Sequence, residues 1–263
     1  MRAATTAPET RNPWLVLLPL SSALISGLAA LVMARRLRQK VRPHEAVWSI
    51  AFGLFAVAAA TQVIGDLGGW TANLARLYYV CGATLVVGWL GLGTWLLLVQ
   101  RSWLRNLGLW LLILVSGYAI GLVTLAPVDS TTLAVSGWHA LQKPLALTIL
   151  TIALNSIGTL LLVGGALWSA WLFWRKGIMR QRMVGCLLLA VGALTVAAGG
   201  SLTRFGHAEY LYIAMSGGVA IMFWGYLKTI RPVAHPAEMA ADKALSTLPV
   251  SVSIKSNAAY SAQ

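Results

Sequence analysis

Seven long apolar runs, separated by short polar segments, set the pattern of the chain as far as residue 230. Each run holds about 20 residues or more, which is the length that an α-helix needs to cross a lipid bilayer. We expect membrane spans at residues 14–34, 46–65, 77–99, 107–126, 145–174, 183–203 and 210–230. The pattern therefore predicts an all-α, polytopic membrane protein with a seven-transmembrane-helix bundle in residues 14–231.

The two ends of the chain lie outside these runs. Residues 1–13 form a short polar segment, and residues 232–263 are rich in Ala, Ser and Pro without helical periodicity. Such a composition buries too little apolar surface to fold, so we expect the tail to be disordered. The first run is predicted to be retained as a helix, because its positive charge follows the run whereas a signal peptide carries charge before it.

Loop charges predict the orientation of the bundle. The first loop packs five cations into Arg35-Arg36-Leu37-Arg38-Gln39-Lys40-Val41-Arg42, and cytoplasmic loops are enriched in Lys and Arg. Thirteen cations share its side of the membrane, namely Arg35, Arg36, Arg38, Lys40, Arg42, Arg101, Arg105, Arg175, Lys176, Arg180, Arg182, Lys228 and Arg231. The other side has five, namely Arg2, Arg11, Arg76, Lys143 and Arg204. We expect the N-terminus outside, the C-terminus in the cytoplasm and a location in the plasma (inner) membrane.

Composition supports the membrane class and changes the meaning of the charge. Hydrophobic residues make up 58% of the chain and charged residues only 10%, more apolar surface than a soluble core of 263 residues could bury. The net charge of +13 would suggest nucleic acid in a soluble domain. Here the cations lie in loops between apolar runs, so we interpret them as topology signals and contacts for anionic lipid headgroups, with no nucleic-acid partner.

Glycines predict how the helices pack. The sixth span carries Gly185, Gly192, Gly199 and Gly206 at seven-residue intervals, nearly two helical turns, so they form one stripe. The fourth span has Gly117 and Gly121 in a small-xxx-small pair. Small residues allow close approach of helices in lipid. We expect contacts within the bundle, and a homodimer face is the alternative.

Polar residues at membrane depth are the candidates for function, because an unsatisfied polar group is costly in lipid. The candidate ligand-binding set is Gln62, Asp66, Arg76, Tyr79, Asn155, Arg204 and Glu209. Most lie near the outer ends of the second, third, sixth and seventh spans, where they could line a polar pocket, with Asp66 or Glu209 countering Arg76 or Arg204. The alternative is that the charges are solvated helix ends and that Gln62 and Asn155 join helices by hydrogen bonds.

Several chemistries lack the residues that they need. The seventh span has no central Lys for a retinal Schiff base, no span has a central Asp or Glu for ion coupling, and GxSxG and HExxH are missing. His139 and His207 could bind a metal only with Asp129 or Glu209, at irregular spacing. Cys81 and Cys186 lie inside apolar runs as small hydrophobes. We expect no cofactor, no metal and no enzymatic activity.

A resemblance adds to this picture. Arg42-Pro43 precedes an Ala-rich second span, and Arg76-Leu77-Tyr78-Tyr79 opens a Gly-rich third span. In this pattern the first four spans resemble the N-terminal seven-helix sensor regions of bacterial histidine kinases, and small stand-alone seven-helix bacterial proteins of unassigned function. The resemblance implies sensing or signal relay. The tail after Arg231 is too short for a kinase or cyclase domain, so a signal would pass to a separate membrane or cytoplasmic protein.

Two functional hypotheses follow. The first is a non-enzymatic membrane module, a sensor or an accessory subunit, whose outer polar residues recognise a small ligand or a protein partner. The second is a small permease or channel with a path between the second, third, fifth and sixth helices and Asn155 near its midpoint. A membrane-embedded enzyme ranks third, because it would need a catalytic constellation that the sequence does not show.

Overall fold

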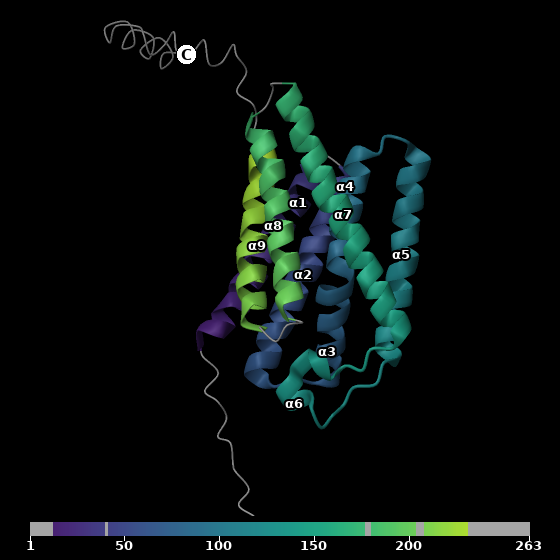
Figure 1. Cartoon of the computed structure of the whole chain (residues 1–263), viewed down its shortest axis with the longest axis vertical. Helices are drawn as coiled ribbons and strands as arrows, with labels where there is room; N and C mark the ends of the chain where they lie inside the picture. Colours follow the sequence, from purple (N-terminus) through teal and green to yellow (C-terminus); the bar gives the residue numbers. More distant parts are fainter. Residues whose placement is uncertain (1–12, 40–41, 177–179, 204–207, 231–263) are drawn as a thin grey trace, which may run out of the picture. The chain divides into compact units, whose positions relative to one another are not determined.

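The computed structural model describes residues 13–39, 42–176, 180–203 and 208–230, and its described regular structure is helical apart from one isolated bridge between Val128 and Leu141 (Figure 1). The short segment before the first span, the tail from 232 to 263, Arg204 and Gly206 lie outside these ranges. Within them, seven helices are long and apolar enough to cross a membrane. The predicted seven-span, all-α fold is confirmed, whereas its orientation stays a prediction.

The helices extend past the apolar runs that predicted them. Their bounds are α1 Pro13–Gln39, α2 Pro43–Gly68, α3 Ala72–Tyr78, the π-helix η1 Tyr79–Leu85, α4 Val86–Leu98, α5 Ser102–Leu125, α6 Leu133–Ser136, the 3-10 helix η2 Gly137–Ala140, α7 Leu145–Arg175, α8 Arg180–Thr203 and α9 Ala208–Ile230. The chain runs continuously through α3, η1 and α4, which together form the third span. Polar residues at the ends of the runs therefore belong to helices rather than loops.

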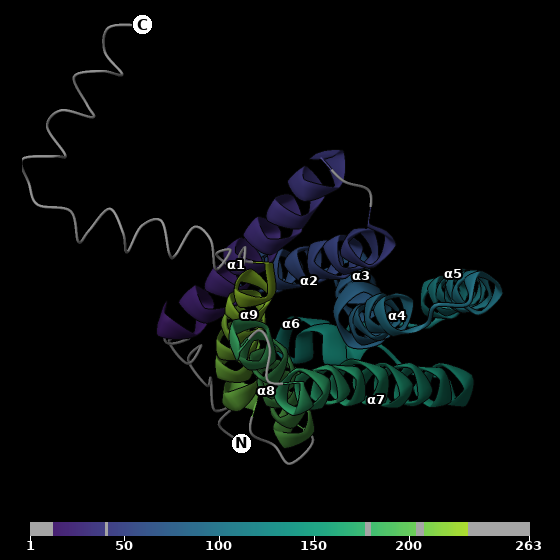
Figure 2. The ribbon, with the colours of Figure 1, turned by 90° about the horizontal axis from the view of Figure 1, so that it is seen from above.

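The second and third spans lie deepest in the bundle. About half or more of the most apolar window of each is buried, a larger share than in any of the other spans. α2 packs against α1, η1 and α4, and α4 packs against α7. α5 lies at the edge beside α4 in both ribbon views (Figures 1 and 2). A functional residue on α2 or the third span is thus placed by several neighbouring helices.

Glycines bring two pairs of helices into backbone contact. On α4 and α7, a Cβ added at Gly91 would lie 2.7 Å from the Cα of Gly158. On α8 and α9, a Cβ at Gly185 would lie 2.7 Å from the carbonyl oxygen of Gly225, and one at Gly192 would lie 2.6 Å from that of Gly218. These distances are possible only without side chains at the crossing points, so the glycines set how closely the helices approach.

The other predicted packing glycines differ from one another. A Cβ at Gly199 would overlap that of Ala214 on α9, so Gly199 extends the α8 contact. Gly117 and Gly121 on α5 would meet no atom within 4 Å. This pair therefore does not make the bundle contact that we expected, because its face of α5 points away from the neighbouring helices.

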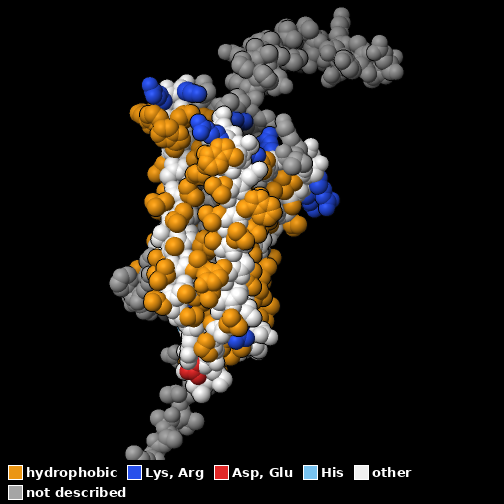
Figure 3. All heavy atoms as spheres, turned by 90° about the vertical axis from the view of Figure 1, so that its right-hand side faces the viewer, with side chains coloured by type: hydrophobic (Ala, Val, Ile, Leu, Met, Phe, Trp, Pro, Cys, Tyr) orange, Lys and Arg blue, Asp and Glu red, His pale blue; other side chains and the backbone are white. Residues whose placement is uncertain are grey.

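The outer surface is apolar along the helices and basic at one end. Large exposed hydrophobic residues occur on every spanning helix, including Leu24, Trp110, Leu114, Leu160 and Trp224. Figure 3 shows hydrophobic side chains over the length of one face, with most Lys and Arg gathered at one end. We call this the basic end of the bundle, and the C-terminal ends of α1, α4, α7 and α9 lie there. The other end of the bundle, where α2 ends at Gly68, is called the opposite end. Such a surface matches lipid, where the hydrocarbon covers exposed apolar side chains.

Candidate functional site

Gln62, Asp66 and Trp70 form a hydrogen-bonded ladder at the C-terminal end of α2, which lies at the opposite end of the bundle. Gln62 Nε2 donates to Asp66 Oδ2 at 3.0 Å, and Trp70 Nε1 donates to Asp66 Oδ1 at 3.3 Å. The spacing of four residues within α2 places the side chains of Gln62 and Asp66 on one face, as we expected, whereas Trp70 follows the end of the helix at Gly68. Both carboxylate oxygens of Asp66 are thereby engaged by donors.

The same glutamine joins α2 to α9. Gln62 Nε2 also donates to the hydroxyl oxygen of Tyr212, at 3.0 Å. Gln62 is only 3% exposed, and its carbonyl oxygen Oε1 is buried without a hydrogen-bond partner among the described residues. A buried acceptor left unpaired costs about 1–3 kcal/mol. Gln62 Oε1 is therefore the atom of this site that a donor group would satisfy.

Glycines hold the indole of Trp70 in place. Gly69, at the end of α2, has a φ of +91°, a conformation that side chains other than glycine rarely adopt. This turn lets Trp70 fold back over α2, where a Cβ at Gly65 would overlap the indole ring. A Cβ at Gly137, from the loop before α7, would lie 3.0 Å from Trp70 Nε1. The indole thus lies against two positions that have no side chain.

An aromatic cap, consisting of Trp70, Tyr78, Tyr79, Trp138 and Lys143, adjoins this ladder through Trp70. Trp70 and Tyr78 meet edge to face with ring centroids 6.0 Å apart, and Tyr78 and Trp138 are 5.1 Å apart. Lys143 Nζ lies 5.4 Å from the centroid of Trp138 and 5.6 Å from that of Tyr79. The cap already binds one ammonium group over aromatic faces, as cation–π attraction favours.

His139 and Asp129 lie in the loop between α5 and α7, and neither takes part in a described metal site. The ring of His139 stacks on Trp138 at 3.6 Å, and burial, then the charge of Lys143, lowers its pKa. Hydrogen bonds from Thr131 lower the pKa of Asp129. Within the described ranges, no group of three or more His, Cys, Asp or Glu residues could hold a metal. His207, the other histidine that we weighed, lies outside those ranges.

Arg76, on α3, contacts the C-terminal end of α5 and does not pair with Asp66. Its Nη2 donates to the carbonyl oxygen of Ala126 at 3.0 Å, and its Nε is buried without a hydrogen bond. Ala126 is the C-cap of α5, where backbone carbonyls lack helical partners and favour a cation. Of the pairings that we considered between Asp66 or Glu209 and Arg76 or Arg204, that of Arg76 with Asp66 is not formed, and Arg76 makes a helix-end contact instead.

Tyr79 belongs to the aromatic cap through its ring, and its hydroxyl shares Thr151 with Asn155 where α7 crosses η1. Asn155 Nδ2 donates to the carbonyl oxygens of Ala83 at 2.8 Å and Thr151 at 2.9 Å. The Tyr79 hydroxyl donates to Thr151 Oγ1 at 3.5 Å, and Thr151 lies 3.3 Å from Thr84 Oγ1. Both amide hydrogens of Asn155 are thus used on backbone, and the group holds α7 against the π-helix.

The candidate residues therefore divide into separate groups. Gln62 and Asp66 are in direct contact, Tyr79 and Asn155 both contact Thr151, and Arg76 lies at α5. The side chain of Glu209 is not described, although the residue belongs to α9. Arg204 lies outside the described residues. The sequence reasoning placed Tyr212 and Trp70 at the outer ends of the spans but missed their hydrogen bonds to Gln62 and Asp66.

The chain matches no protein family, no curated protein and no solved structure. The site is therefore interpreted from its own geometry. That geometry provides a buried acceptor at Gln62, a carboxylate at Asp66 and aromatic faces within one region.

A second polar group, at the basic end, was also missed. Glu45 lies in the first turn of α2 and is only 2% exposed. The sequence reasoning placed it before the second span, because the apolar run begins one residue later. A Glu that follows Pro43 at a helix start was the available signal, since acids favour the first turn.

Proposed function

We propose that the protein is a non-enzymatic membrane module, sensor-like or an accessory subunit, that recognises a small ligand or a protein partner at its opposite end. The observation that carries this proposal is the buried carbonyl oxygen of Gln62, which has no described hydrogen-bond partner. It lies between α2 and α9, bonded through its own amide to Asp66 and Tyr212. A ligand that donates a hydrogen bond there would pair an acceptor that the fold leaves open.

The surrounding groups select the chemistry of the ligand. Asp66 supplies a carboxylate beside Gln62, and Trp70 and Tyr78 supply aromatic faces. A carboxylate, a carbonyl oxygen and aromatic rings together favour a primary ammonium group, which is cationic and carries three N–H donors. We infer that the module recognises an amine.

The proposal is non-enzymatic because the two hydrogen bonds from Gln62 and Trp70 hold the carboxylate of Asp66 in place as a fixed charge. A carboxylate oxygen has two lone pairs, so such a bond does not prevent it from also accepting from an N–H donor of a ligand. Recognition of a cation needs such a fixed acceptor.

The experiment is a thermal-shift titration of the purified full chain in lipid nanodiscs with ethylammonium and, separately, tetramethylammonium. A ligand at 100 times its Kd stabilises the folded state by about 2.7 kcal/mol. We expect ethylammonium to raise the melting temperature, and tetramethylammonium, which lacks N–H donors, to do so less.

The variants Gln62→Met and Asp66→Asn should lose the shift. Asp129→Asn, at an exposed acid of the loop between α5 and α7, is the matched control and should keep it. A wild-type protein that ignores both amines, or a shift that persists in Gln62→Met and Asp66→Asn, would refute the amine site.

The permease hypothesis gains no comparable support. It required Asn155 on a solute path near the middle of the bundle, and the amide of Asn155 donates both of its hydrogens to backbone carbonyls of the third and fifth spans. A side chain used in this way joins helices, which was the alternative interpretation of Asn155.

A further inference from the structure

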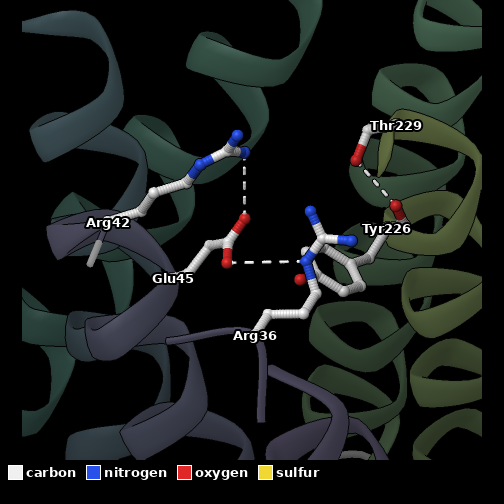
Figure 4. A network of polar contacts seen from close by, with 5 residues as sticks. All are labelled: Arg36, Arg42, Glu45, Tyr226 and Thr229. Atoms are coloured by element: carbon white, nitrogen blue, oxygen red, sulfur yellow. Dashed lines mark hydrogen bonds and ion pairs between the residues drawn. The ribbon is translucent and has the colours of Figure 1, made fainter. Parts of the chain in front are cut away.

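Glu45, Arg36 and Arg42 form a charged cluster at the basic end. Arg42 Nη1 lies 3.3 Å from Glu45 Oε1, and Arg36 Nε lies 3.7 Å from Glu45 Oε2 (Figure 4). Arg36 comes from the last turn of α1, whereas Glu45 comes from the first turn of α2. One buried carboxylate therefore faces two guanidinium groups, and the ion pairs leave a net charge of +1.

Tyr226 brings a further donor to this cluster from α9. The residue is 1% exposed, and its hydroxyl is buried without a hydrogen-bond partner among the described residues. Figure 4 shows its side chain beside Arg36. The Nε of Arg36 is likewise buried and has no partner within hydrogen-bond distance, although it faces Glu45. Donors thus outnumber acceptors, and each unpaired buried donor costs free energy.

The cluster can be reached from outside the bundle. The side chain of Arg36 is 33% exposed and that of Arg42 is 42% exposed, whereas Glu45 is at 3%. All four residues lie within a turn or two of a helix end. An anion can therefore approach the guanidinium groups without separating the helices, and Glu45 stays behind them.

We propose that the cluster of Arg36, Arg42, Glu45 and Tyr226 binds a phosphate group, supplied by an anionic lipid headgroup or by free phosphate. Guanidinium groups bind phosphate oxygens through paired N–H donors, and basic sites between helix ends bind anionic headgroups. The phosphate would balance the net positive charge, and it would accept from the buried hydroxyl of Tyr226 once the partly exposed side chain of Arg36 shifts to admit it. Glu45 is a positioning residue, because it holds both guanidinium groups from the buried side.

The site differs from general attraction between loop cations and an anionic surface. General attraction depends on the number of charges near the membrane and is nearly indifferent to which cation is removed. A built site depends on Arg36 and Tyr226 in particular. Arg35, the neighbour of Arg36 on α1, is exposed and makes no described contact with the cluster, so it provides a comparison of equal charge.

The test measures the melting temperature of the full chain in nanodiscs of phosphatidylcholine with increasing phosphatidylglycerol, and separately in detergent with inorganic phosphate. Sodium chloride at the same ionic strength controls for screening. The variants are Arg36→Gln and Tyr226→Phe, with Arg35→Gln as the control.

We expect phosphatidylglycerol or phosphate to stabilise the wild type and Arg35→Gln, with at least a threefold weaker apparent affinity in Arg36→Gln and Tyr226→Phe. Tyr226→Phe keeps the ring and removes only an unpaired hydroxyl, so it should fold without loss of stability. Stabilisation by the lipid alone identifies a headgroup as the source, and stabilisation by both identifies phosphate itself. No stabilisation of the wild type, or an equal response in Arg35→Gln and both cluster variants, would overturn the proposal.

Discussion

The crossing of α4 and α7 leaves no room for a side chain at Gly158. In Gly158→Ala, the new Cβ would lie 2.7 Å from the carbonyl carbon of Val87 and 3.0 Å from the amide nitrogen of Gly88, and nearer still to the Val87 oxygen. These neighbours are backbone atoms, so no rotamer change can relieve the overlap. The two helices must move apart by about 1 Å, a gap that forfeits a quarter to a half of each dispersion contact that it widens.

The expected cost follows from two opposing terms. Overpacking a well-packed interface costs about 1–3 kcal/mol, and a backbone neighbour places Gly158→Ala at the upper end of that range. Replacing glycine by alanine inside a helix returns about 0.5–1 kcal/mol, because alanine loses less backbone entropy on folding. The net expectation is a loss of about 2–2.5 kcal/mol in the free energy of unfolding.

The assay is reversible unfolding of the purified protein in mixed micelles, followed by far-ultraviolet circular dichroism. Gly164→Ala is the matched control, since Gly164 lies on the same helix and its added Cβ would meet no atom within 4 Å. The control should be neutral or more stable by up to about 1 kcal/mol. A Gly158→Ala protein as stable as Gly164→Ala would refute the inference that backbone contact fixes this crossing.

Two further predictions concern a hydroxyl group and a histidine. Ser216 Oγ on α9 donates to the carbonyl oxygen of Leu18 at 2.6 Å and lies 2.8 Å from Ser22 Oγ on α1, so Ser216→Ala should cost about 0.6–1.7 kcal/mol in the same unfolding assay. Burial, then Lys143, lowers the pKa of His139 below 6.5, so the unfolded chain takes up a proton first as pH falls. Stability from this group is complete above pH 6.5 and declines as pH falls from there toward the lowered folded pKa. His139→Gln should remove that decline in melting temperature.

Each of these has its own control. Thr195→Val removes an exposed hydroxyl that bonds only to its own helix, at Val191, and should leave the free energy of unfolding within about 0.5 kcal/mol of the wild type. If Ser216→Ala behaves in the same way, the hydroxyl does not join α1 to α9. For His139, melting curves that fall equally with pH in the wild type and in His139→Gln would show that another group causes the decline.

The seven spans could be predicted because lipid demands one simple property of each, an apolar run of sufficient length. The ends of the helices could not, since hydropathy stops at the first polar residue. Glu45 shows the consequence: it precedes the apolar run that begins at Ala46 but belongs to a helix that begins at Pro43. Its burial depends on Arg36 and Arg42, which no periodicity reveals.

Glycine spacing was informative on α8 and misleading on α5. Gly185 and Gly192 face glycines of α9, whereas Gly117 and Gly121 face no neighbouring helix. Spacing shows that a close approach is permitted at one face of a helix. Whether another helix occupies that face depends on the arrangement of the whole bundle.

The candidate site was predictable only as far as one helix face reaches. The four-residue spacing placed Gln62 beside Asp66, and the structure shows their hydrogen bond. The bond from Gln62 to Tyr212 depends on how α9 lies against α2, 150 residues away in the chain. Charge alone offered Arg76 the carboxylates of Asp66 or Glu209, whereas the end of α5 provided the carbonyl that it contacts.

The π-helix Tyr79–Leu85 has a consequence for the rotational phase of the third span. An α-helix advances about 100° per residue, and a π-helical turn accommodates one residue more than an α-helical turn. Tyr78, before this segment, packs toward the aromatic cap, and Gly91, after it, packs against α7. Rewinding all seven residues of Tyr79–Leu85 as a regular α-helix would turn Gly91 by about 100° away from Gly158, whereas deleting one of them as well would largely restore its direction. The π-helical winding of this short segment thus fixes the angle between the two faces of the helix.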